Sequence, residues 1–130
     1  VYYLAFHGAP GSVSSLLDIV GPDRLCNAFR DFGVADCLVY FGSCSVFRGR
    51  AGQRFARDFL DASGARAVLG YTEDVDWMVS MIADLLFLQR FYAARDPWPD
   101  LARIHASVTT DFRPAQKAGL SLFLGGSPAG

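Results

Sequence analysis

A histidine and a cysteine each stand where an apolar run of the chain stops. The first run, VYYLAFHGAP, carries His7 and Gly8 at its end, and the second, CLVYFGSCSV, carries Cys44. Cysteine attacks as the thiolate, but its ordinary pKa of about 8.5 leaves only a small ionised fraction at neutral pH. A nearby imidazole can accept the thiol proton or polarise a target carbonyl. The two residue types therefore predict nucleophilic chemistry at Cys44 with His7 as its partner.

Glycines beside these two residues favour the same interpretation. Gly8 and Gly42 lack a Cβ, so they allow a close approach of the backbone, and their N–H groups are candidates to face a developing oxyanion. The alternative is structural, because free cysteine is often a small buried hydrophobe. In that interpretation His7 is an ordinary residue at the end of a strand.

The other cysteines and the second histidine are expected to be structural. Cys26 falls on the apolar stripe of a helix pattern and Cys37 at the start of a strand pattern, which is typical of core residues. His105 follows the apolar residues of another helix and is interpreted as an ordinary helix residue. Three cysteines without C-x-x-C spacing argue against a disulfide framework and against a zinc site. We expect a reducing, cytoplasmic location, no metal and no organic cofactor.

Strand and helix patterns alternate along the chain. Strand patterns cover residues 1–6, 37–41, 65–71 and 119–125, with a minor strand at 18–20. Helix patterns cover residues 23–32, 50–62, 76–94 and 97–105, the first capped by Asp23 and the last begun by Pro97. Residues 7–11 are expected to be a turn, the strand at 1–6 to be fully buried, and the helix at 76–94, apolar almost all round, to be buried as well. This alternation predicts an α/β fold with a mainly parallel sheet.

The predicted sheet places the candidate residues at one edge. Ligands of open α/β sheets bind outside the carboxyl ends of the strands. His7, Cys44 and the loop at 71–76 each follow the carboxyl end of a predicted strand. Because parallel strands end at the same edge, we expect these three segments to lie together there.

The loop YTEDVDW holds three acidic residues, Glu73, Asp74 and Asp76. One interpretation is a helix N-terminus, with Asp74 or Asp76 as its N-cap. The other is a substrate pocket in which an acid pairs with a basic side chain of the substrate. Trp77 is then either a pocket wall or part of the core.

Arginines follow the candidate nucleophile closely in the sequence. Arg48, Arg50 and Arg54 are expected either to lower the pKa of the Cys44 thiol by Coulomb attraction or to form a solvated face.

Composition limits the classes of partner. The chain of 130 residues is 52% hydrophobic with a formal net charge of −1, which indicates one core-rich domain, residues 1–124, followed by a loose tail at 125–130. Without a basic segment it lacks the charge that nucleic-acid binding needs. Its longest apolar stretch, MVSMIADLLFLQRFY, is too short and too polar to span a bilayer. The chain starts inside a strand pattern without an initiator Met, so we expect an N-terminal portion to be missing.

Three segments of the chain, by their sequences and their order, resemble the caspase-like cysteine peptidases. This group contains caspases, separases and bacterial CHAT domains. The segments are YYLAFHGAPG, CLVYFGSCSVF and GARAVLGYTEDVDW, and the resemblance runs from Val1 to about Tyr92. It implies a three-layer sandwich without its N-terminal strands, with Cys44 as nucleophile, His7 as general base or imidazolium partner, and Gly8 as oxyanion donor. It also implies that the acidic loop pairs with a basic substrate side chain, as in separase-like members. Unlike caspases, the chain has Gly-Ser before the cysteine and no Arg-Gly after it.

The function expected from these patterns is hydrolysis of a peptide or protein substrate through a Cys44/His7 dyad and an acyl-enzyme. One alternative is a catalytically degenerate caspase-like module in protein–protein assembly, in bacterial signalling or defence, that uses exposed apolar groups such as Trp98. Another is a different Cys/His acyl-transfer or amidohydrolase enzyme on a similar sheet.

Overall fold

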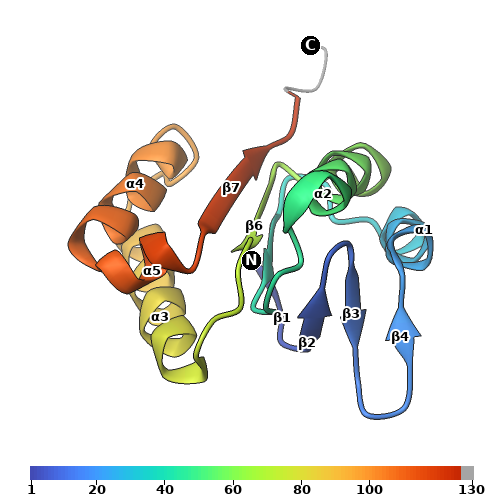
Figure 1. Cartoon of the computed structure of the whole chain (residues 1–130). Coiled ribbons are helices and arrows are strands. Elements are labelled where there is room, and N and C mark those ends of the chain that lie inside the picture. The colour runs from blue at the N-terminus through green and yellow to red at the C-terminus, as the bar shows by residue number, and fades with distance from the viewer. Residues whose placement is uncertain (127–130) are drawn as a thin grey trace.

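A four-stranded sheet divides the molecule into two helical layers (Figure 1). The computed structural model describes residues 1–126. The strands, in spatial order, are β1 (Tyr2–Leu4), β5 (Leu38–Phe41), β6 (Ala67–Tyr71) and β7 (Leu120–Leu124). β1, β5 and β6 are parallel, and β7 runs antiparallel to β6. The predicted α/β class with a mostly parallel sheet is confirmed.

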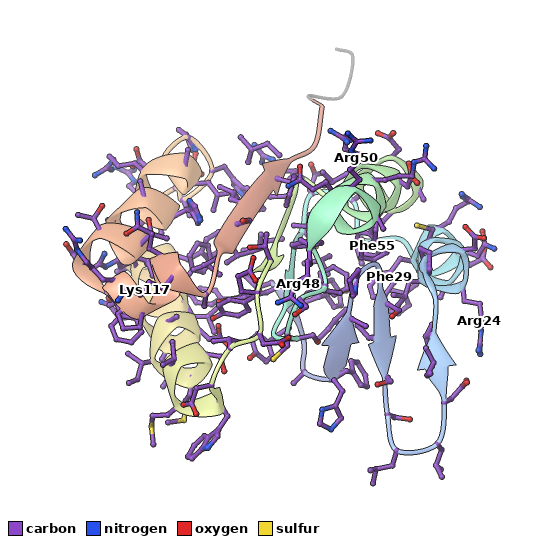
Figure 2. All side chains as sticks on the ribbon, in the orientation of Figure 1. Arg24, Phe29, Arg48, Arg50, Phe55 and Lys117 are labelled. Atoms are coloured by element: carbon purple, nitrogen blue, oxygen red, sulfur yellow. The ribbon has the colours of Figure 1, made fainter. Side chains whose placement is uncertain are left out.

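Helices cover both faces of this sheet. One face carries α1 (Pro22–Phe32) and α2 (Gly49–Ser63), and the other carries α3 (Trp77–Ala93), α4 (Leu101–Asp111) and α5 (Arg113–Lys117) (Figure 1). Every residue of β5 and β6 is buried, because each of these strands has a neighbour on both sides and helices on both faces. Phe29 and Phe55 belong to the core between the sheet and the helices α1 and α2, and Figure 2 shows them on that side of the sheet.

A small antiparallel sheet follows β1 directly. Its strands are β2 (His7–Ala9), β3 (Ser12–Ser14) and β4 (Ile19–Val20). The turn predicted over residues 7–11 is confirmed only at Pro10 and Gly11, which connect β2 to β3, and is wrong for residues 7–9, which form β2. Gly11 has φ 69°, a conformation that glycine adopts without steric cost. The minor strand predicted near Ile19 is confirmed.

Several helix boundaries differ from the prediction. Gly21, not Asp23, is the N-cap of α1, since Pro22 already takes the first helical position. α4 begins at Leu101 rather than at Pro97, and the sequence patterns did not indicate α5. The ends predicted for the helix patterns at residues 32 and 62 agree with α1 and α2 to within one residue. Gly33 and Gly64 are the C-caps of these helices, and both have positive φ.

Two apolar segments are more exposed than predicted. β1 is an edge strand, so its fully buried state was predicted wrongly, and Tyr3 keeps 44% of its surface exposed. α3 is buried only on the side that faces the sheet. Its outer side exposes apolar residues, namely Trp77, Met78, Met81, Ile82 and Leu85.

The chain beyond β7 is described only as far as residue 126. The N–H of Gly125 donates to the Arg66 carbonyl oxygen at 2.8 Å, so this residue is still attached to the sheet. Residues 127–130, the rest of the predicted tail, lie outside the described residues. No helix within residues 1–126 has the length and apolarity needed to cross a membrane.

Candidate active site

Cys44 lies in the loop that leads from β5 to α2. Its side chain is half-buried, and its sulfur contacts the loop that follows β6. The thiol donates to the Val75 carbonyl oxygen at 3.4 Å and accepts from the Val75 N–H at 3.5 Å. The carboxyl ends of β5 and β6 therefore meet at this sulfur, as the parallel arrangement predicts.

Backbone hydrogen bonds hold the Cys44 loop on both sides. The N–H of Gly42 donates to the Leu4 carbonyl oxygen at 2.9 Å, and the N–H of Ser45 donates to the Glu73 carbonyl oxygen at 3.1 Å. Gly42 was predicted as an oxyanion donor, and this is wrong because its N–H is already bound to β1. The N–H of Cys44 itself makes no hydrogen bond within residues 1–126. The sequence patterns did not indicate that donor.

Gly8 packs directly against the backbone of Cys44. A Cβ at Gly8 would overlap the Cys44 carbonyl oxygen and lie 2.9 Å from the Ser43 Cβ. The hairpin is fixed to the same loop a few residues on, where the Gly11 N–H donates to the Val46 carbonyl oxygen at 2.8 Å. The hairpin that carries His7 thus lies along the loop that carries Cys44.

His7 is exposed at the start of β2, where it pairs with Ser14. It lines an open cavity of about 330 Å³ together with residues such as Phe6, Leu16 and Gly42. Its imidazole makes no hydrogen bond to any residue between 1 and 126, the Cys44 thiol included. The structure brings the two segments together but shows no hydrogen bond between the ring and the thiol.

Each of the three acidic residues in the loop has a partner within the protein. Asp74 accepts a hydrogen bond from the Ser45 hydroxyl, and Glu73 pairs with Arg48 at 2.9 Å. Asp76 is the N-cap of α3, so the predicted capping role is confirmed at this residue. Whether Glu73, Asp74 or Asp76 also meets a substrate stays a prediction.

The arginines after Cys44 divide into two groups. Arg48 joins the Cys44 loop to the acidic loop, because its Nε also donates to the Thr72 carbonyl oxygen at 3.2 Å (Figure 2). Arg50 and Arg54 are exposed on α2, as the solvated-face interpretation expects. Figure 2 shows Arg50 at the outer side of this helix.

Replacing Asp76 with alanine is expected to lower the free energy of unfolding by about 1 kcal/mol. The Asp76 carboxylate accepts from the N–H groups of Met78 at 2.9 Å and Val79 at 3.4 Å, and both would lose this partner. Urea denaturation measures the change. Asp100 is the matched control, because it occupies the same position in α4 but makes no capping hydrogen bond. An equal loss in Asp100→Ala would contradict the assignment.

The remaining cysteines and His105 have structural positions. Cys26 is buried on α1, and burial raises the pKa of its thiol. Cys37 is half-buried against the same core, and all three cysteines are free. The Nε2 of His105 lies 2.7 Å from the Leu120 carbonyl oxygen and so ties α4 to β7.

Trp98 is not the exposed apolar group that was expected. It is half-buried, and the guanidinium of Arg66 stacks 4.3 Å from the centre of its ring. Trp77 instead is exposed, at 68% of its surface, and lines a cavity beside α3.

The sequence patterns did not indicate a buried carboxylate on α3. Asp84 accepts hydrogen bonds from the hydroxyls of Tyr3, Tyr40 and Tyr71, the last at 2.6 Å. Burial is the main cause that raises the pKa of each of these tyrosines well above its usual value, and the Asp84 carboxylate raises it further. The hydroxyls therefore stay protonated and act as donors. The one signal in the sequence is an acid in the middle of an apolar helix pattern.

Comparison with known proteins gives no relative: no family model, curated protein or solved structure matches the chain. Within residues 1–126, no group of three or more His, Cys, Asp or Glu side chains is arranged to hold a metal ion.

Proposed function

We propose that this chain is a caspase-like cysteine peptidase domain that hydrolyses peptide bonds through Cys44 and His7. The observation that carries the proposal is the packing of Gly8 on the Cys44 backbone, since it fixes the histidine-bearing hairpin beside the cysteine-bearing loop. Both segments follow parallel strands, β1 and β5, at their carboxyl ends. This edge is where open α/β sheets bind their ligands.

The reaction would proceed through a thioester. The Cys44 sulfur attacks the scissile carbonyl carbon while His7 takes the thiol proton, and the C–N bond then breaks as the leaving amine receives that proton. Water next attacks the thioester carbonyl, which releases the carboxylic acid and restores the thiol. Neither step needs an oxidant, a reductant or a metal.

Two backbone groups are proposed to bind the oxyanion of the tetrahedral intermediate. The Cys44 N–H is free within the described part of the chain and adjoins the attacking sulfur. Gly8 is the second donor by the resemblance to caspase-like peptidases, and its backbone lies against Cys44. Donors that are fixed before the reaction stabilise the developing charge without reorganisation.

A non-catalytic assembly module is the second candidate. It is favoured by the exposed apolar side of α3 and by the lack of a hydrogen bond between the His7 ring and the Cys44 thiol. In that case Cys44 has no role in the function, and partner binding survives its replacement.

Alkylation by iodoacetamide, followed by mass spectrometry, tests the proposal without a known substrate. We expect Cys44 to react about tenfold faster than Cys26 or more, because the Cys26 thiol is buried and burial raises its pKa. His7→Ala is expected to slow the reaction at Cys44 alone. Equal labelling of Cys26 and Cys44, or a Cys44 rate that does not respond to His7→Ala, would count against the dyad.

A further inference from the structure

α3 carries an uncharged apolar stripe on the side that faces away from the sheet. The helix has two charged residues, of which Asp84 is buried and Arg90 pairs with Asp111 of α4 at 2.7 Å. Neither of them therefore lies on the outer side. The large apolar side chains that the helix exposes there form what we call the outer stripe of α3, namely Trp77, Met78, Met81, Ile82, Leu85 and Tyr92.

The area of the outer stripe is close to that of one side of a dimer interface. Trp77 and Tyr92 are 68% and 67% exposed, and the other four side chains are 42% to 61% exposed. At about 100 Å² for each side chain, the stripe exposes roughly 600 Å² of apolar surface. A standard interface buries about 800 Å² on each partner, and monomers rarely expose a continuous apolar patch of more than a few hundred Å². The outer stripe therefore indicates that another protein surface covers it.

The stripe has the spacing of a seam between two helices. Met78, Met81, Leu85, Leu88 and Tyr92 follow one another at alternating steps of three and four residues. This is the spacing with which the side chains of one helix pack into the holes of a second. At 1.5 Å per residue, the seam from Met78 to Tyr92 is about 21 Å long. Leu85 lies at its middle.

A cavity along the seam has room for side chains of the second helix. Its volume is about 380 Å³, and it lies between Tyr3 of β1 and residues of α3 that include Met81, Leu85 and Leu88. Asp84 also lines it, but this carboxylate already accepts hydrogen bonds from three tyrosine hydroxyls. The cavity therefore suits an apolar side chain.

The absence of charge on the outer stripe favours a second copy of this chain as the occupant. Interfaces between different proteins generally use complementary charges to steer and orient the partner, and the stripe offers none. A copy related by a two-fold axis presents the same apolar seam at the same length, and no like charges meet. We propose that this chain forms a homodimer in which the outer stripes of two α3 helices pack against each other. Because Leu85 is the middle of the seam, it meets its own equivalent whichever way the two helices run.

The dimer does not depend on the proposed function, because the thiol takes no part in it. Trp77 begins α3 two residues after Val75, which contacts the Cys44 sulfur, so the seam starts beside the candidate active site. Cys44→Ala should nevertheless dimerise as the unchanged protein does. A failed peptidase therefore leaves the dimer intact, and a monomeric protein leaves the peptidase proposal intact.

Sedimentation velocity over a series of protein concentrations tests the dimer. We expect a monomer–dimer equilibrium with a dissociation constant of roughly 10 µM or lower. Leu85→Glu should raise this constant by about 100-fold or more, because two carboxylates would meet inside an apolar seam. Leu17→Glu is the matched control and should leave it unchanged. Leu17 is 97% exposed, but it lies between β3 and β4, whose valines pack into the core on the α1 and α2 side.

A mixture of two variants separates direct contact from a fold defect. Leu85→Lys alone should also be monomeric, and mixing it with Leu85→Glu should restore association by about tenfold or more, since opposite charges then meet. Far-UV circular dichroism checks that both variants keep their helices. A protein that stays monomeric at about 100 µM would overturn the inference, as would a dimer that survives Leu85→Glu or a mixture that does not associate. A monomer that binds phosphatidylcholine vesicles and loses this binding in Leu85→Glu would overturn it as well, because the stripe would then contact lipid.

Discussion

Replacing Cys44 with alanine is expected to lower peptide hydrolysis by about 10⁴-fold or more, because no other group in the loop can form the thioester. The fold should be retained. The Cys44 sulfur is half-buried and bonds only to the backbone of Val75, so alanine removes few contacts. Turnover is measured with fluorogenic peptides that present each of the twenty residues before the scissile bond, and stability by thermal denaturation.

Cys37→Ala is the control for this experiment. Cys37 is also half-buried and free, but it stands at the opposite end of β5. It should keep full turnover. Hydrolysis that persists in Cys44→Ala would contradict the assignment of Cys44 as the nucleophile. Turnover of small amides without turnover of peptides would contradict the proposed peptidase activity and favour an amidohydrolase. Partner binding without any turnover would favour the assembly module.

The buried strands were predictable because their residues carry the signal themselves. β5 and β6 are short apolar runs between glycines or polar turns, and a run that is apolar on both faces fits only a strand with helices on both sides. β1 has the same kind of run, but a run does not tell how many strands lie beside it. The number of neighbours is a tertiary property, and so its edge position was missed.

The hairpin of β2 and β3 was missed for a related reason. Glycine, proline and serine between His7 and Ser14 are the residues of turns, and three-residue strands have little pattern of their own. What fixes this hairpin lies elsewhere in the chain, at the Val46 carbonyl and the Cys44 loop. The residues of the hairpin itself do not predict these contacts with distant parts of the chain.

The candidate site also has one part that the sequence predicts and one part that depends on tertiary contacts. The order of strand ends predicted that the segments of His7, Cys44 and the acidic loop share an edge, because that follows from the direction of parallel strands. The Asp84 cluster could not be assembled in this way, since Tyr3 and Asp84 stand 81 residues apart. A lone acid in an apolar helix signals that partners exist, but only the sheet register identifies them.

Replacing Gly8 with alanine is expected to lower the free energy of unfolding by about 2–3 kcal/mol and to slow alkylation of Cys44. Gly8 does not have a positive φ, so its backbone conformation does not require glycine. Glycine is needed here because there is no room for a Cβ. The new Cβ would overlap the Cys44 carbonyl oxygen, a backbone atom that cannot turn aside as the end of a side chain can. The N–H of Ser45 is bound to Glu73, and the Ser43 hydroxyl accepts from the Phe6 N–H at 3.3 Å, so the loop is held on both sides of Cys44.

The hairpin must therefore move away from the loop in Gly8→Ala, and His7 moves with it. A displacement of about 1 Å between reacting groups can cost about 100-fold in rate, so turnover should fall by more than the loss of stability alone explains. Gly21→Ala is the control, because a Cβ there meets nothing within 4 Å. Since Gly21 is the N-cap of α1, its replacement should cost about 1 kcal/mol at most and should leave alkylation of Cys44 unchanged. If Gly8→Ala were as stable and as reactive as the unchanged protein, the hairpin would not lie on the Cys44 loop, and the pairing of His7 with Cys44 would lose its structural basis.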